Sequence, residues 1–536
     1  MATVTRRARR DRRRGGPRAV LLVLLVCLGL LAPGTSLAAR TSATHAAWTD
    51  TEWVHAGLTV RMPRDCATPG RYTAATDAAL LRGQVGPTSL ATVAGLSGLR
   101  VTRSGTGTTP APATALPAGP DAFRDPLGAE AVAGLVAAEL GGVVQLAAPA
   151  QAAGVLHQYG RATSAGQAHA AAGAVTDSGA LLVGASQAGA ATLPGPAALD
   201  LAALAPGTAA LAGVRLRVGA VAAGARLDGC LRDEGGASAV REYGIASLRA
   251  DVASPPVAAL TQTTTAAVAT AQGTVTALEQ TLAAVLLRDL NLLGLGTVTT
   301  SATVTVDLQQ AVAPLLQQTL TDGVVTVDLA AGRVQVDLAA LPAGPGGLDG
   351  RSPGTVLALD AAAAAAVGAR VDTLLRTWVG TVVQTVDTAL RGAAVDIRAS
   401  IKAPLLPALT VRVSGTLAQV VAGNATVSAV GLSLPPAVLA TLGTAVSGAL
   451  FTPPGGAVPV LRSTLLAAVP AVLTQVGAAV SALGTAVRLT VNVHTDDPVA
   501  DTWAVTALRV QVLTGSNVGS RVDLATASVG PVRERP

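Results

Sequence analysis

The sequence predicts an α+β fold that is rich in β-strands, with antiparallel sheets, several amphipathic helices packed on them, and more than one domain. Short alternating stretches separated by glycines and prolines extend from residue 41 to about 254. Helical spacing of apolar residues begins near Pro256, and beyond residue 295 strand-like and helix-like stretches follow one another. The expected domains are a β-rich one at 39–254, a helix with a strand-helix-hairpin segment at 255–345, and an α+β domain at 346–536.

The first 38 residues have the order of a secretory signal peptide. Eight arginines between Arg6 and Arg18 precede an apolar run at 19–31, and small residues follow up to Ala38 and Ala39. We expect cleavage near Ala38 or Ala39 and export of the mature chain to the extracellular space or the cell surface. The apolar run is shorter than the ~20 residues of a membrane span, which makes an uncleaved anchor the less favoured alternative.

Loss of this leader changes the charge of the chain. Residues 1–38 contain eight arginines and one acid, Asp11, so their removal lowers the formal net charge from +6 to −1. A nearly neutral chain offers no general basic surface, and we expect no nucleic-acid partner. The expected partners are cell-envelope components or other surface proteins, with no stable transmembrane segment after cleavage.

Export also bears on the cysteines. Cys27 lies in the leader, which leaves Cys66 and Cys230 in the mature chain. An even pair in an oxidising compartment favours one disulfide, with free buried thiols as the alternative. The bond would close a loop of about 165 residues and stabilise the fold by up to about 5 kcal/mol.

The N-terminal part is predicted to contain short strands. Apolar and polar residues alternate at 211–228 and again at 243–252, as in half-buried strands. The segment 105–120 is rich in Thr, Pro, Gly and Ala and is predicted to be a loop or linker. A short helix is predicted at 130–140.

A long amphipathic helix is predicted at 256–293, where Val and Leu recur at helical spacing, and a coiled-coil partner helix is the alternative. The phrase Val-x-Val-Asp-Leu then occurs three times, at 304–308, 325–329 and 334–338. Its apolar residues are expected to face a core from β-strands, while its polar residues face solvent or end the strand. A helix at 309–321 fits between the first two copies.

The C-terminal part is expected to continue this mixture. Its predicted elements are a helix at 360–390 and strands at 395–402, 409–417, 488–493, 503–513 and 522–529. The uncharged stretch 465–487 is long enough for a membrane span. Its apolar residues form one stripe, however, with Thr, Gln and Ser elsewhere, which favours a packed amphipathic helix.

The sequence shows no recognisable catalytic motif. The five histidines lack the spacing of a zinc motif, and no convincing G-x-S-x-G occurs. We expect no catalytic residue, no cofactor and no metal site. The carboxylates of Asp496, Asp497 and Asp501, near His494, could hold calcium, but the spacing of a calcium-binding loop is missing, which favours a solvated turn.

Two segments are candidates for binding. Trp48 and Trp53 stand five residues apart in a chain with 2% aromatic residues. They predict either a glycan-stacking or partner-binding patch, or an N-terminal strand that docks through its tryptophans. The second segment, 413–461, contains no charged residue, which favours a role in association.

Several phrases of the sequence occur in a characteristic order. They are AWTDTEWVH at 47–55, LHQYGRA at 156–162, HAAAGAVTDSGA at 169–180, REYGIASL at 241–248 and TALRV at 506–510. In this order they resemble the choice-of-anchor G family of bacterial surface proteins. The resemblance implies an exported, cell-envelope-associated protein of undefined biochemical activity. No L-P-x-T-G sorting motif precedes Pro536, so we expect release or non-covalent retention.

These observations together favour a secreted, non-enzymatic surface protein with a structural or adhesive role. The alternative is a secreted hydrolase or carbohydrate-binding protein whose site is assembled from residues distant in the sequence. Clustered buried carboxylates, or a histidine beside a serine in a cleft, would favour that alternative.

Overall fold

The computed structural model describes residues 70–535 apart from short internal segments and a few single positions. The chain divides into Met1–Met62 and a compact unit at Pro63–Pro536, to which all described residues belong. The predicted leader, Trp48, Trp53 and Cys66 lie outside the described residues, as does most of the helix predicted at 130–140. The longer internal segments left out are 128–135, 146–155, 185–192, 194–196, 205–210, 236–238, 292–296, 342–346, 403–408, 431–434 and 515–516.

The predicted α+β, β-rich class is confirmed: the described strands form four antiparallel sheets, and helices pack on them. The largest sheet has eight strands, joined in the order β19-β23-β24-β25-β1-β3-β4 with β2 paired to β1. Its members are β1 (Tyr72–Val85), β2 (Thr88–Ser89), β3 (Leu99–Ser104), β4 (Gly107–Ala111), β19 (Thr355–Val356), β23 (Val487–Asp497), β24 (Thr502–Thr514) and β25 (Asn517–Glu534). The first described strand thus pairs with the last, from Tyr72 opposite Glu534 to Gln84 opposite Arg521.

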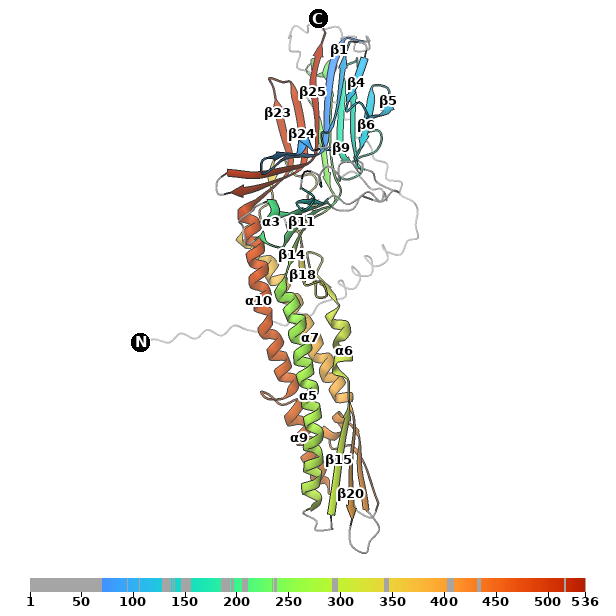
Figure 1. Cartoon of the computed structure of the whole chain (residues 1–536), viewed down its shortest axis with the longest axis vertical. Helices are drawn as coiled ribbons and strands as arrows, with labels where there is room; N and C mark the ends of the chain where they lie inside the picture. The colour runs from blue at the N-terminus through green and yellow to red at the C-terminus, as the bar shows by residue number, and fades with distance from the viewer. Residues whose placement is uncertain are drawn as a thin grey trace, which may run out of the picture. The chain divides into compact units, whose positions relative to one another are not determined.

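A six-stranded sheet packs face to face on this sheet, and the two form a sandwich (Figure 1). Its strands are β5 (Leu116–Gly119), β6 (Ala122–Pro126), β8 (Leu156–Ala162), β9 (Gln167–Ala174), β12 (Val221–Asp228) and β13 (Val240–Ile245). Small residues allow the close approach. A Cβ atom on Gly160 would lie 2.7 Å from Val101 Cγ2 and 2.8 Å from Thr76 Oγ1, so only glycine fits there. Alanines of β9 and β12 fill the core where a chain richer in aromatics would place larger side chains.

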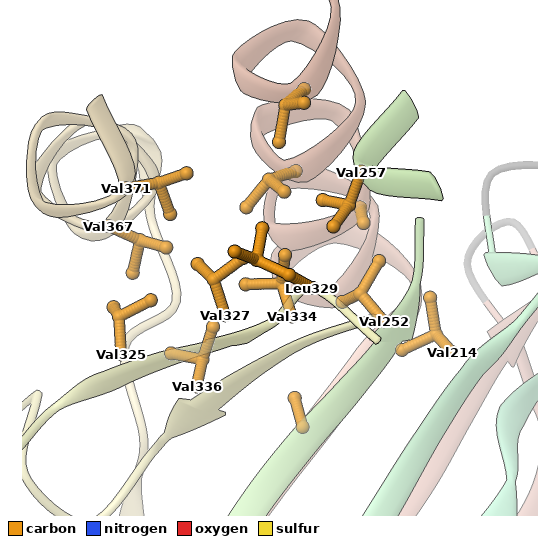
Figure 2. Close-up of a cluster of buried hydrophobic side chains, with 14 of the residues drawn as sticks. Val214, Val252, Val257, Val325, Val327, Leu329, Val334, Val336, Val367 and Val371 are labelled. Atoms are coloured by element: carbon orange, nitrogen blue, oxygen red, sulfur yellow. The ribbon is translucent and has the colours of Figure 1, made fainter. Parts of the chain in front are cut away.

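A third sheet has seven strands, and its buried side chains meet two long helices. The strands are β7 (Val144–Gln145), β10 (Ala197–Asp200), β11 (Val214–Val218), β14 (Leu248–Ala253), β16 (Thr319–Thr321), β17 (Val325–Asp328) and β18 (Arg333–Asp337). Figure 2 shows valines of β17 and β18 pointing toward valines of the helices α5 (Pro255–Asn291) and α7 (Ala361–Gly392). The second and third Val-x-Val-Asp-Leu copies form the β17–β18 hairpin with their apolar residues buried, as predicted.

The long helix α10 (Ala457–Ala486) lies against both α5 and α7 (Figure 1). Buried residues recur every three or four positions on each of the three helices, so one stripe per helix faces the elements packed against it. Among the described helices, α10 alone is long and apolar enough to cross a membrane. Its contacts with α5 and α7 confirm the prediction of a packed amphipathic helix, which begins at Ala457, before the predicted start. Shorter helices are α3 (Leu201–Leu204), α4 (Gly229–Asp233), α6 (Leu308–Leu316), α8 (Leu417–Val421) and α9 (Pro436–Leu450).

The fourth sheet contains β15 (Thr297–Thr305), β20 (Ala394–Lys402), β21 (Leu409–Thr416) and β22 (Thr426–Ala429). Its edge strand β15 lies against α5. The Glu279 carboxylate of that helix accepts the Val304 N–H at 2.7 Å, and the Gln272 side chain bonds both Leu308 N–H and Val306 C=O at 3.2 Å. Helix side chains therefore satisfy backbone groups that an open edge would expose.

Several predicted elements were wrong in detail. The stretches 211–228 and 243–252 are not single strands, because each passes from one sheet to another: β11 and β14 lie in the seven-stranded sheet, β12 and β13 in the six-stranded one. Mutual hydrogen bonds hold the two corners, from Gly219 N–H to Ser247 C=O and from Ala246 N–H to Ala220 C=O, both at 2.8 Å. Residues 218–225 are all Val, Gly or Ala, so no polar residue marks the first corner in the sequence.

The segment predicted as a loop at 105–120 contains β4 and β5. The helix predicted at 309–321 ends at Leu316, and β16 takes the remainder. The sheets also do not follow the boundaries expected at 254 and 345. β14 pairs with β18 across the first boundary, and β1 pairs with β25 across both.

Candidate functional site

A groove on the outer face of the six-stranded sheet is the candidate functional site. In its centre, Arg161 of β8 lies opposite His169 of β9, and His169 lies opposite Arg226 of β12. Val240 of β13 continues the row beyond Arg226. We call this hollow the arginine groove; its volume is about 620 Å³, and Gln167, Ser178, Asp228 and Leu231 also line it.

Strand alternation places these side chains on the outer face. Ala168, Ala170 and Ala172 of β9 are buried in the main core, so His169 between them points to the opposite side. After β9 the chain folds back over the outer face and brings Ser178 and Gly179 to the groove. A Cβ on Gly179 would lie 2.8 Å from His169 Cε1 and still closer to Tyr159, so glycine is required there.

His169 is held as a neutral imidazole. Burial lowers its pKa to about 4, and the neighbouring charges of Arg226 and Arg161 act in the same direction. The Arg226 Nε–H points to His169 Nε2 at 3.4 Å, which suits an unprotonated acceptor nitrogen. The Tyr159 ring packs against the imidazole with centroids 5.0 Å apart. At neutral pH the row therefore presents two positive charges with an uncharged group between them.

These two arginines lack carboxylate partners within the described part of the chain, where neither forms an ion pair. A hollow of about 630 Å³ on the four-stranded sheet provides the contrast. Its arginines, Arg398 and Arg412, both bond Asp396, at 2.7 and 2.8 Å. In that second hollow one carboxylate holds both guanidinium groups, whereas no carboxylate of the described residues bonds the two arginines of the arginine groove.

The helix α4 forms one wall of the groove and is fixed from several sides. Asp228 Oδ1 accepts the N–H groups of Cys230 and Leu231, each at 3.1 Å. Arg232 donates to both carboxylate oxygens of Asp501, at 2.9 and 3.0 Å, and to a β25 carbonyl at 2.7 Å. Cys230 is buried and disulfide-bonded. The exposed Leu231 side chain is thus presented to the groove from a rigid support.

Of the site residues predicted from sequence, Trp48, Trp53 and Cys66 lie outside the described residues. Cys230 is a disulfide cysteine, but its predicted partner Cys66 is not described. The uncharged segment 413–461 contains the end of β21, α8, β22, α9 and the start of α10; β22 pairs with β21 in the four-stranded sheet, and α9 contacts α5.

The predicted acidic group does not converge on one point. Asp496 pairs with Arg241, Asp497 accepts N–H groups of its own turn at 2.8 and 3.0 Å, and Asp501 pairs with Arg232. This is the arrangement of a turn and not that of a calcium site. In the described ranges, no three His, Cys, Asp or Glu side chains gather as metal ligands do.

Sequence reasoning missed the arginine groove. Its residues are separated by as many as 79 positions, from Arg161 to Val240, and strand pairing alone brings them into one row. The available signal was weak. The phrases LHQYGRA and HAAAGA contain Arg161 and His169 at positions where a fully buried strand would carry Ala or Val.

A domain family of unknown function, DUF8394, matches residues 76–530, a range that contains both faces of the sandwich and the whole helical part. The chain belongs to this family. The match includes every residue of the arginine groove. Comparison with curated proteins and with solved structures found no significant similarity.

Proposed function

We propose that this protein is an exported, cell-envelope-associated surface protein that acts by binding, in a structural or adhesive role. The observation that carries the proposal is the buried, disulfide-bonded Cys230. Structural disulfides form and persist in oxidising compartments and are rare in the cytosol. This agrees with the signal-like leader and with the resemblance to the choice-of-anchor G family.

Cell fractionation tests export directly. The producing cells are separated into cytosol, membrane, wall and medium, and the intact mass of the protein is measured with and without reduction. We expect a mature chain that begins near residue 39 or 40, in the wall or the medium, with Cys230 of the denatured chain resistant to alkylation until a reductant is added. Recovery of the chain with Met1 in the cytosol and a freely alkylated Cys230 would refute export.

A carbohydrate-binding role is the second candidate, and the arginine groove favours it. The groove brings a histidine and a serine into one hollow, as the alternative prediction required. A hydrolase would need His169 as a base near neutral pH, but a pKa of about 4 makes it a poor one. The Ser178 hydroxyl also bonds Thr176 Oγ1, at 2.9 Å. Neither side chain is therefore suited to attack on a ligand, and the Ser178 hydroxyl is better suited to hydrogen bonding with one.

Binding to the envelope can be measured separately from export. Purified, disulfide-bonded mature protein is mixed with washed envelopes of the producing cells and sedimented. We expect saturable cosedimentation, which a purely soluble protein would not give.

A further inference from the structure

The charge of the arginine groove indicates the kind of ligand it accepts. Arg161 and Arg226 carry two positive charges, and Asp228 is the one carboxylate that lines the hollow. Asp228 already caps α4 and accepts the Gln167 side-chain N–H at 3.4 Å. Its oxygens are therefore directed to the protein, and the two guanidinium groups remain for an anion.

The spacing of the two arginines suits a small ligand. They stand on β8 and β12 with β9 between them, so their Cα atoms are about 10 Å apart. Both side chains are long enough to reach a common point above His169. Guanidinium groups bind carboxylate and phosphate oxygens in pairs, which fixes the orientation of the anion as well as its position.

The remaining lining distinguishes among anionic ligands. Gln167 and Ser178 offer hydrogen bonds to hydroxyl groups, while Ala180, Leu231, Ala239 and Val240 offer an apolar surface, with Leu231 and Val240 57% and 51% exposed. The two guanidinium groups and the polar side chains beside them favour a ligand that combines an anion with hydroxyl groups over an acyl chain, and a folded protein partner would need a face of roughly 800 Å². A volume of about 620 Å³ suits a ligand of one or two sugar rings.

We propose that the arginine groove binds an acidic sugar unit, with Arg161 and Arg226 holding its carboxylate or phosphate group and the Gln167 and Ser178 side chains bonding its hydroxyls. The proposal rests on the binding role proposed above, because export places the groove among the polymers of the cell envelope. Carboxylated and phosphorylated sugars share the chemistry that the groove recognises.

The test titrates mature, disulfide-bonded protein with glucuronic acid, glucose 1-phosphate, glucose and inorganic phosphate, by calorimetry and by NMR of the His169 ring. We expect at least one acidic sugar to bind tenfold or more tightly than both glucose and inorganic phosphate. Whichever of the two acidic sugars binds more tightly identifies the source of the charge. If neither acidic sugar binds more tightly than glucose, the role of charge is overturned, and if neither binds more tightly than inorganic phosphate, recognition of the sugar is overturned.

Variants locate the binding. The double substitution Arg161→Gln and Arg226→Gln should weaken acidic-sugar binding at least tenfold, while Arg488→Gln, an exposed arginine on β23, removes one charge and should leave binding unchanged. Both arginines of the groove are exposed, so the double variant is expected to fold, which its circular dichroism checks. Unchanged affinity in the double variant would refute the site. The result does not depend on fractionation: a cytosolic protein that binds the sugar refutes export alone, and an exported protein that does not bind refutes the groove alone.

Discussion

Lowering the pH from 7 to 4 should expose the unusual titration of His169. In the folded protein its pKa is lowered from 6.5 to about 4, first by burial and then by Arg226 and Arg161, with a hydrogen bond to the Gly179 backbone as the opposing influence. The unfolded chain has no such environment, so there the histidine protonates near pH 6.5. Between these two values the unfolded state binds more protons than the folded state.

The sign of the effect follows from this difference in proton binding. The stability of the fold falls as the pH decreases from about 6.5 toward 4, because protons favour the state that binds them. A pKa difference from 6.5 to about 4 corresponds to a loss of about 3 kcal/mol at the acidic end. The lowered pKa values of His157 and His494 act in the same direction, but they are present in any variant of His169.

The assay compares the wild type with His169→Gln, whose neutral side chain does not titrate. Denaturant unfolding at pH 7 and pH 4 should show that the variant loses about 3 kcal/mol less than the wild type. NMR of ¹³C-labelled histidine rings should show one resonance that titrates near pH 4 and is missing in the variant. A His169 resonance that titrates near 6.5, or equal acid sensitivity of the two proteins, would refute the reasoning.

Two further predictions concern the scaffold. Glu279→Ala removes the acceptor of the Val304 N–H at the β15 edge and should lower the free energy of unfolding by about 1–3 kcal/mol. Denaturant titration measures this difference, and an unchanged free energy would mean that water replaces the carboxylate. Gly173→Ala should reduce the yield of folded protein sharply, because Gly173 has a φ of +98° and an added Cβ would lie 2.0 Å from the Val221 carbonyl oxygen. The control is Gly273→Ala, in an open part of α5, which should raise the free energy of unfolding by up to about 1 kcal/mol. A Gly173→Ala protein that is soluble and as stable as the wild type would contradict the steric argument.

The long helices and the Val-x-Val-Asp-Leu hairpin were predictable because their signals are local. In α5, an apolar residue every three or four positions specifies both the helix and its buried face, and Val257 to Leu290 are buried in that rhythm. In β17 and β18, alternation specifies which side chains face the core. Neither prediction needs knowledge of the partner element.

Sheet membership was not predictable in this way. The corner at Gly219 lies in a run of Val, Gly and Ala at 218–225, which fits one long strand as well as two strands in different sheets. Pairing partners lie far away along the chain, as with β1 and β25, and the apolar pattern of a strand does not name its neighbour. The positions of the corners and the antiparallel order of the four sheets therefore appear only in the tertiary structure.

The sequence by itself determined the β-rich α+β class, the long helices and the faces they bury, since these depend on the spacing of apolar residues over a few turns or strand positions. The tertiary structure decided the arginine groove. Arg161, His169 and Arg226 become neighbours through the registers of β8, β9 and β12, and the low pKa of His169 arises from burial and charges that only this register brings together. The physical reason is that periodicity is a local property of the chain, whereas register and electrostatic environment are properties of paired strands.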